Sequence, residues 1–134
     1  MFKNQRGQTL VEFAIAIVIL FLFVFGLMGA TLWGTASFLA QEIAHETARE
    51  YAVSNDKARA ISTGKTYIGR WGYIFIAPGS TQISVNEAGD KATAVITVKP
   101  RIQKLFIFTM PSISKYSQAT FEHYIRNPDL YVAN

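Results

Sequence analysis

An apolar run near the N-terminus is the feature that most constrains this chain. Between Phe13 and Leu32 lie twenty residues without a charge, and Thr31 is the one polar side chain among them. At about 1.5 Å per residue, a helix of this length spans roughly 30 Å, the thickness of a bilayer's hydrocarbon core. Lys3 and Arg6 precede the run, and basic residues are biased toward the cytoplasm. The sequence therefore predicts a single-pass protein of the cytoplasmic (inner) membrane, with its N-terminus inside.

A cleaved secretory signal is the alternative for this segment. Its apolar core is longer than the 7–15 residues that are usual in such signals. Thr35-Ala36-Ser37, which follows the run, keeps this alternative open as a weak cleavage site.

The helical pattern continues beyond the apolar run. Over residues 34–53, apolar side chains recur at helical spacing on one side and polar side chains occupy the other. The predicted inward residues are Phe38, Leu39, Ile43, Ala44, Ala48, Tyr51 and Ala52. We therefore expect one helix over about residues 8–53, apolar all round at first and amphipathic afterwards. A simple anchor does not need this second half, which must cover its own domain or a neighbour.

A second helix and a small sheet are expected after the long helix. Ser54 or Asn55 is predicted to cap a helix from Lys57 to about Trp71, with Asp56 in its first turn. Its predicted inward residues are Ala58, Ile61, Tyr67 and Ile68, and Gly64 and Gly69 are expected to weaken it. Residues 72–79 are predicted to form a short strand or an extended connector.

Alternating residues predict an antiparallel sheet of three strands. Residues 81–86 and 91–99 alternate and are separated by the turn signal Glu87-Ala88-Gly89-Asp90, which is typical of a hairpin. Residues 117–125 are the candidate third strand. The sheet is expected to lie on the outer half of the first helix, which gives an α+β fold. We thus expect a leader over residues 1–7, a transmembrane or assembly helix over 8–33, and an extracytoplasmic domain over 34–134.

Gly7 and Glu12 lie just before the apolar run. Gly7 ends the short basic leader, and Glu12 is the fifth residue counted from Gln8. A carboxylate near the membrane interior is costly unless it is paired or neutralised. Either Glu12 reaches the headgroup level, or it meets a positively charged partner.

This pattern resembles the class III signal of type IV pilin-like proteins. The string Arg-Gly-Gln-Thr-Leu-Val-Glu-Phe-Ala is similar to the start of TadE-like pseudopilins of the tight-adherence (Flp) pilus system. The resemblance implies that a membrane aspartyl prepilin peptidase cleaves between Gly7 and Gln8. It also implies assembly through the helix from Phe13 onward, with Glu12 facing the new amino terminus of a neighbouring pilin subunit. A buried ammonium group would make a buried carboxylate tolerable.

Two further features are candidates for contacts between subunits. Gly26, Ala30 and Gly34 repeat every four residues, and small residues on one stripe let helices approach closely in a membrane or filament core. The alternative is that glycine is simply common in membrane helices. Leu105, Phe106, Ile107 and Phe108 form a second apolar run, too short to cross a membrane. They form either a loop or short helix that closes the core, or a surface patch that docks on the membrane or the next subunit.

Composition excludes several classes of site. The chain has no cysteine, so it has no disulfide, cysteine zinc site or cysteine nucleophile. Its net charge of +4 comes from scattered basic residues, so no nucleic-acid partner is expected. His45 and His123 are far apart in the sequence and have no carboxylate cluster at the spacing of metal ligands, so we expect no metal, no cofactor and no enzymatic activity.

Two functions remain. The first is a structural, pilin-like subunit that is inserted in the membrane and assembled into, or initiates, a tight-adherence pilus, and that becomes extracellular on assembly. The second is a bitopic protein whose external domain binds a ligand or partner and never polymerises.

Overall fold

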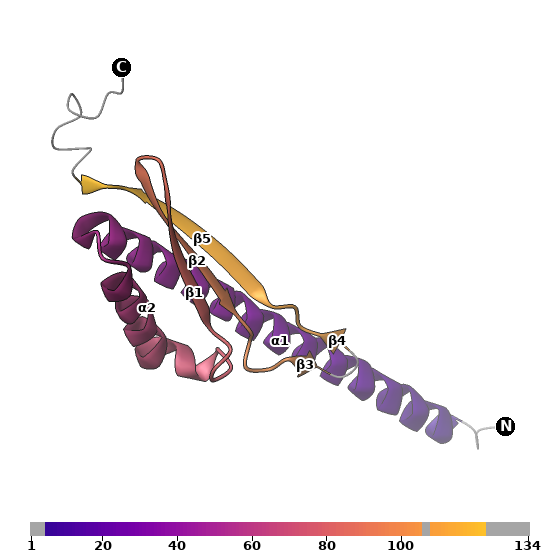
Figure 1. Ribbon diagram of the computed structural model, residues 1–134. Helices are drawn as coiled ribbons and strands as arrows, with labels where there is room; N and C mark the ends of the chain where they lie inside the picture. The colour runs from indigo at the N-terminus through magenta and orange to yellow at the C-terminus, as the bar shows by residue number, and fades with distance from the viewer. Residues whose placement is uncertain (1–4, 106–107, 123–134) are drawn as a thin grey trace.

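One long helix forms the axis of the molecule (Figure 1). The computed structural model describes residues 5–105 and 108–122, with side chains from residue 7 onward. The N-terminal half of the helix stands alone, and the other elements pack along its C-terminal half. In chain order the elements are α1 (Gln5–Ser54), α2 (Lys57–Trp71), η1 (Gly72–Ile74), β1 (Gln82–Ala88), β2 (Lys91–Val98), β3 (Lys104–Leu105), β4 (Phe108–Thr109) and β5 (Ile113–Thr120). The predicted α+β fold is confirmed.

Helix α1 is continuous from the predicted leader to the end of the amphipathic segment. It has 50 residues, about 75 Å at the usual rise per residue. The predicted helix over 8–53 is therefore confirmed as one element. Its start is not at residue 8, because the helix already begins at Gln5, within the predicted leader.

A row of alanines forms the contact line of α1 with its domain. Alanines recur every four residues on one side of the helix. Four of them are fully buried, namely Ala36, Ala40, Ala44 and Ala48, and the fifth, Ala52, is 6% exposed. Small side chains at this spacing let the sheet approach the helix closely. The prediction that Phe38 faces inward is wrong, because its side chain is 69% exposed. Phe38 lies two residues from Ala36, roughly 200° around the helix, and so points away from the sheet.

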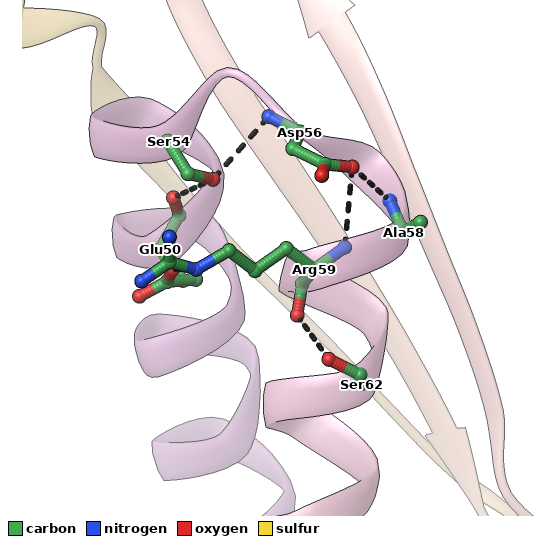
Figure 2. A network of polar contacts seen from close by, with 6 residues as sticks. All are labelled: Glu50, Ser54, Asp56, Ala58, Arg59 and Ser62. Carbon is green, nitrogen blue, oxygen red and sulfur yellow. Dashed lines mark hydrogen bonds and ion pairs between the residues drawn. The ribbon is translucent and has the colours of Figure 1, made fainter.

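Helix α2 begins with a polar network at its junction with α1 (Figure 2). Asp56 is the N-cap, and its Oδ1 accepts hydrogen bonds from the backbone N–H groups of Ala58 and Arg59, at 2.9 and 3.2 Å. Ser54 Oγ donates to the carbonyl of Glu50 at 2.7 Å and accepts from the backbone N–H of Asp56 at 3.3 Å. The Arg59 side chain reaches back to the Glu50 carboxylate at 2.6 Å. This junction fixes the angle at which α2 folds back along α1.

The predicted cap at Ser54 or Asn55 is wrong, and each residue has another role. Ser54 closes the last turn of α1, as described above. Asn55 adopts the left-handed conformation, with φ of 53°, and its N–H donates to the carbonyl of Tyr51. Asparagine tolerates this conformation better than most residues, so Asn55 ends one helix and Asp56 starts the next.

Asp56→Ala is expected to lower the free energy of unfolding by about 1 kcal/mol, because two helix N–H groups lose their acceptor. Chemical denaturation of the full chain in detergent micelles, followed by circular dichroism, measures the loss. Asp56→Asn is the matched control and is expected to retain most of the stability. Equal stability of the alanine and asparagine variants would contradict the capping role.

Helix α2 has the predicted bounds, and three of its four predicted inward residues, Ile61, Tyr67 and Ile68, are partly buried against the core. Ala60 and Gly64 are its buried residues, whereas Ala58, which was predicted to face inward, is exposed. A Cβ atom on Gly64 would lie 2.6 Å from Thr47 Oγ1 and 3.0 Å from Ile83 Cδ1. The glycine that weakens the isolated helix is therefore the point at which α2 approaches α1 and β1.

Residues 72–79 form neither a strand nor a simple extended connector. They begin with the 3₁₀ turn η1, and Ile76 then makes an isolated antiparallel bridge with Pro100. This bridge holds the end of α2 beside the segment that leaves β2.

The sheet has the order β1-β2-β5 and is antiparallel throughout. The hairpin of β1 and β2 is confirmed, with a tighter turn than expected, since only Gly89 and Asp90 separate the strands and Gly89 has φ of 64°. The inward residues of β2 are buried as predicted, namely Ala92, Ala94, Ile96 and Val98. The three-strand prediction is confirmed.

The bounds predicted for the third strand are wrong. Strand β5 runs over Ile113–Thr120 rather than 117–125, and residues 123–125 lie outside the described residues. Its register pairs Ile113 with Val98 and Thr120 with Lys91, so the neighbouring strand determines where β5 begins and ends. Phe121, which follows the strand, is buried against Tyr51 as an edge-to-face aromatic pair.

Candidate assembly and membrane site

Gly7, Gln8 and Glu12 share one exposed side of α1. Gln8 Nε2 donates a hydrogen bond to Glu12 Oε1 at 3.0 Å, one helical turn away. A Cβ atom on Gly7 would meet nothing within 4 Å. Together with Val11, these three residues line a shallow depression on the helix surface. The predicted processing residues and the carboxylate thus lie side by side. Within residues 7–105 and 108–122, no basic side chain forms an ion pair with Glu12, and its role in contact with a neighbour stays a prediction.

The apolar part of α1 presents its side chains outward on every side. From Phe13 to Met28 large apolar residues are mostly about half exposed or more, with Phe13 at 63% and Phe23 at 71%. An 18-residue window of this helix has a mean hydropathy of 2.9, and none of that window is buried in the protein. By length and composition this helix could span a membrane, which agrees with the predicted anchor.

The small-residue stripe of α1 is open. Gly26, Ala30 and Gly34 are exposed, and a Cβ atom on either glycine would meet nothing within 4 Å. Phe38, one turn beyond Gly34, is exposed on the same line. The domain of this chain therefore leaves the stripe uncovered, and its role in assembly stays a prediction.

A third helical glycine, which the sequence analysis overlooked, is buried. A Cβ atom on Gly29 would lie 2.6 Å from Leu105 Cδ2 and 3.3 Å from Met110 Cε. Leu105 belongs to β3, which pairs with β4 in a small antiparallel hairpin. Trp33 Nε1, one turn later, donates to the carbonyl of Pro111 at 3.4 Å. The hairpin thus lies along the last turns of the apolar run (Figure 1), within the segment predicted as the transmembrane helix.

The second apolar run, over residues 105–108, is neither a plain loop nor a short helix. Its described residues belong to the β3–β4 hairpin, in which Leu105 is half-buried against α1 and Phe108 is 68% exposed. Phe106 and Ile107 lie outside the described residues. One described residue of the run therefore packs inward and the other faces outward. The sequence did not indicate that Gly29 is a contact point, because Leu105, which packs on it, is more than seventy residues away in the chain.

His45 is exposed on α1, and its Nδ1 lies 3.4 Å from Ser117 Oγ of β5. Among the described residues, His, Asp and Glu side chains do not gather in groups of three that could hold a metal ion. His123 lies outside the described residues.

Comparison with known proteins gives one family match, which lies in the N-terminal part of the chain. Residues 7–49 match the family model described as TadE-like protein, which covers about a third of the chain, from the predicted processing site to the amphipathic part of α1. No curated protein and no solved structure matches the chain. The matched segment contains Gly7, Glu12 and the whole apolar run. Over these residues the long helix is similar to that of TadE-like proteins.

Proposed function

We propose that this protein is a structural subunit of the tight-adherence pilus machinery rather than an enzyme. It is inserted in the cytoplasmic membrane with its N-terminus inside, and a prepilin peptidase cleaves it between Gly7 and Gln8. The mature helix then packs against the helices of other pilin subunits, in a pilus or in the complex that initiates one.

The observation that carries this proposal is the exposed carboxylate of Glu12, which lies on an apolar helix that the rest of the described protein does not cover. Leu105 and Met110 bury Gly29, so we place the outer end of the lipid-facing segment of α1 at Met28 and count back from there to Leu10. These 19 residues span about 28 Å, which matches the hydrocarbon core. On this placement Glu12 lies inside the hydrocarbon and needs a partner stronger than the amide of Gln8. The amino terminus that cleavage creates on a neighbouring subunit supplies a positive charge.

The open stripe on α1 supports packing between subunits. A Cβ atom on Gly26 or Gly34 would meet nothing within 4 Å, so a second helix can approach the backbone there. A helix that served only as an anchor would not need an open stripe that continues to Phe38, beyond the run.

The test compares three variants in cells that make the pilus. Gly7→Val is expected to block leader removal, because it places a branched side chain directly before the bond that the peptidase cleaves, where the native residue has none. Glu12→Ala is expected to leave insertion and cleavage intact and to abolish incorporation into sheared surface material. Immunoblots of membranes and sheared fractions measure both effects, and mass spectrometry of the incorporated protein should find Gln8 as its first residue.

Glu42→Ala is the matched control, because it removes an exposed carboxylate from the same helix outside the apolar run. It is expected to assemble normally. A mature mass unchanged by Gly7→Val would rule out cleavage at this site. Normal incorporation of Glu12→Ala would rule out the role of the carboxylate and favour the bitopic protein that binds a partner without polymerising.

A further inference from the structure

The end of the domain nearest the apolar run lies at the level where the hydrocarbon core would stop. The hairpin of β3 and β4 contacts α1 at Gly29, and η1 comes close to α1 at Leu32, where Ile74 lines a shared cavity. Both segments lie toward the bare half of α1, whereas the β1–β2 turn and the start of α2 lie at the opposite end (Figure 1). We call this end the membrane-facing end, defined by Ile74, Arg101, Ile102, Lys104 and Phe108.

Large apolar side chains are exposed at the membrane-facing end. Phe108 is 68% exposed, Ile74 50% and Ile102 39%. They come from η1, from the segment after β2 and from β4, so three separate parts of the chain contribute to one end of the domain. Ile74 and Ile102 line one cavity with Leu32, which belongs to the helix that could span a membrane.

Outside α1, the described acidic residues of the domain lie at its far end, whereas basic residues occur at both ends. Residues 57–86 and 91–121 contain no Asp or Glu. Glu87, Asp90 and Glu50 lie around the far end of the domain, where Tyr51 donates to Glu87 and the N–H of Phe121 donates to the carbonyl of Asp90. The membrane-facing end instead carries exposed basic residues, namely Arg70, Lys99, Arg101 and Lys104. A surface of this sign attracts anionic lipid headgroups and is not repelled by acidic neighbours.

A cavity of about 210 Å³ lies between α1 and the membrane-facing end. Its lining is mostly apolar and includes Leu32, Ile74, Pro100 and Ile102, with Arg101 as a basic residue among them. Arg101 also donates from its guanidinium to the carbonyl of Tyr73, which holds its side chain at this end. An apolar space beside a membrane helix with a fixed guanidinium suits the glycerol region of a phospholipid below its phosphate.

We propose that the membrane-facing end docks on the bilayer and binds anionic phospholipid. Phe108, Ile74 and Ile102 enter the headgroup layer, while Arg101 and Lys104 contact lipid phosphates. Docking holds the domain against the membrane before assembly, so extraction of the subunit must break these contacts as well as remove the helix. The proposal rests on the membrane insertion proposed above, and it does not depend on leader cleavage or on polymerisation.

The test uses the full chain in bilayer nanodiscs and exploits its lack of cysteine. Single cysteines that carry a nitroxide label replace Thr109 at the membrane-facing end, Val53 at the far end and Phe21 in the apolar run, all exposed positions. Electron paramagnetic resonance measures the access of a water-soluble nickel complex to each label. In anionic nanodiscs the Thr109 label is expected to be several-fold less accessible than the Val53 label, and the Phe21 label should report hydrocarbon.

Lipid composition and one pair of variants test the role of charge. Replacing anionic by zwitterionic lipid, or introducing Lys104→Gln, is expected to restore much of the access at Thr109. Lys91→Gln is the matched control, because it removes an exposed lysine from the far end of the sheet. If access at Thr109 changes neither with lipid charge nor with Lys104→Gln, the assignment to anionic lipid is overturned.

Three further outcomes would overturn the proposal in distinguishable ways. A Thr109 label as accessible as the Val53 label, with Phe21 in hydrocarbon, would refute docking and leave membrane insertion intact. A Phe21 label in water would refute both insertion and docking. Shielding at Thr109 that disappears when nanodiscs hold one protein each would assign this surface to a second copy of the chain instead of lipid.

Discussion

Gly64→Leu is expected to lower the free energy of unfolding by about 3 kcal/mol or more, although leucine is by far the better helix former. A Cβ atom at this position meets Thr47 Oγ1 at 2.6 Å and Ile83 Cδ1 at 3.0 Å, and Thr47 is completely buried. A leucine side chain therefore forces α2 away from α1 and β1. Denaturation of the full chain in detergent micelles measures the loss.

Gly69→Leu is the matched control in the same helix. Gly69 has nothing within 4 Å of its Cβ position, so leucine there is expected to raise stability by up to about 1 kcal/mol. A second comparison isolates the contact with Thr47, since Gly64→Ala should cost less when Thr47→Ala has removed the hydroxyl. Similar effects of leucine at positions 64 and 69 would show that α2 does not pack as described.

Tyr51→Ala is expected to lower the free energy of unfolding by about 3–5 kcal/mol, because it empties the centre of the core at the far end of the domain. Tyr51 is 1% exposed and packs edge-to-face on Phe121, with ring centroids 5.3 Å apart. Its hydroxyl donates to the Glu87 carboxylate. This one side chain joins α1, the β1–β2 hairpin and the residue after β5.

Tyr51→Phe separates packing from the hydrogen bond. It keeps the ring against Phe121 and is expected to cost only about 1–2 kcal/mol, which is the loss of a hydrogen bond to a charged acceptor. Thermal unfolding of the two variants beside the wild-type chain gives the comparison. An alanine variant no less stable than the phenylalanine variant would contradict the central position of the ring.

The same residue makes stability depend on alkaline pH. Burial raises the pKa of Tyr51 to about 12, and the hydrogen bond to Glu87 and its negative charge act in the same direction. In the unfolded chain the pKa of tyrosine is about 10. The folded state therefore holds its proton longer, and this contribution is complete below pH 10 and is lost as pH rises through 12. Between these values the loss reaches about 1.4 kcal/mol per pH unit, and it is expected to be absent from the Tyr51→Phe variant.

Much of the fold follows from patterns that are local in the sequence. The apolar run and the periodicity after it predict one long helix, and the alternation on both sides of Gly89-Asp90 predicts the β1–β2 hairpin. These patterns succeed because a helix and a tight hairpin are determined by residues that are neighbours in the chain. The third strand is different, because its bounds depend on the register that β5 takes against β2.

The candidate site also has one part that the local sequence predicts and one part that depends on the tertiary structure. Gly7 and Glu12 are singled out by their spacing, because the predicted processing signal and the first helical turns are both local, and the TadE-like match begins at Gly7. The membrane-facing end could not be predicted from the sequence, because it brings together η1, the segment after β2 and the β3–β4 hairpin. Only the path of the chain places Phe108 near the helix that contains Leu32.

Glycines show most clearly what the sequence determined and what tertiary structure decided. The chain alone predicts that Gly26 and Gly34 lie on one stripe of the helix, and the structure shows that nothing within the described protein covers it. The chain alone gives no sign that Gly29 and Gly64 are contact points, because a missing side chain has meaning only when another segment fills the space. Leu105 fills that space at Gly29, and Thr47 and Ile83 fill it at Gly64. Spacing along one helix is a local property, whereas close packing between distant segments is decided by the folded chain as a whole.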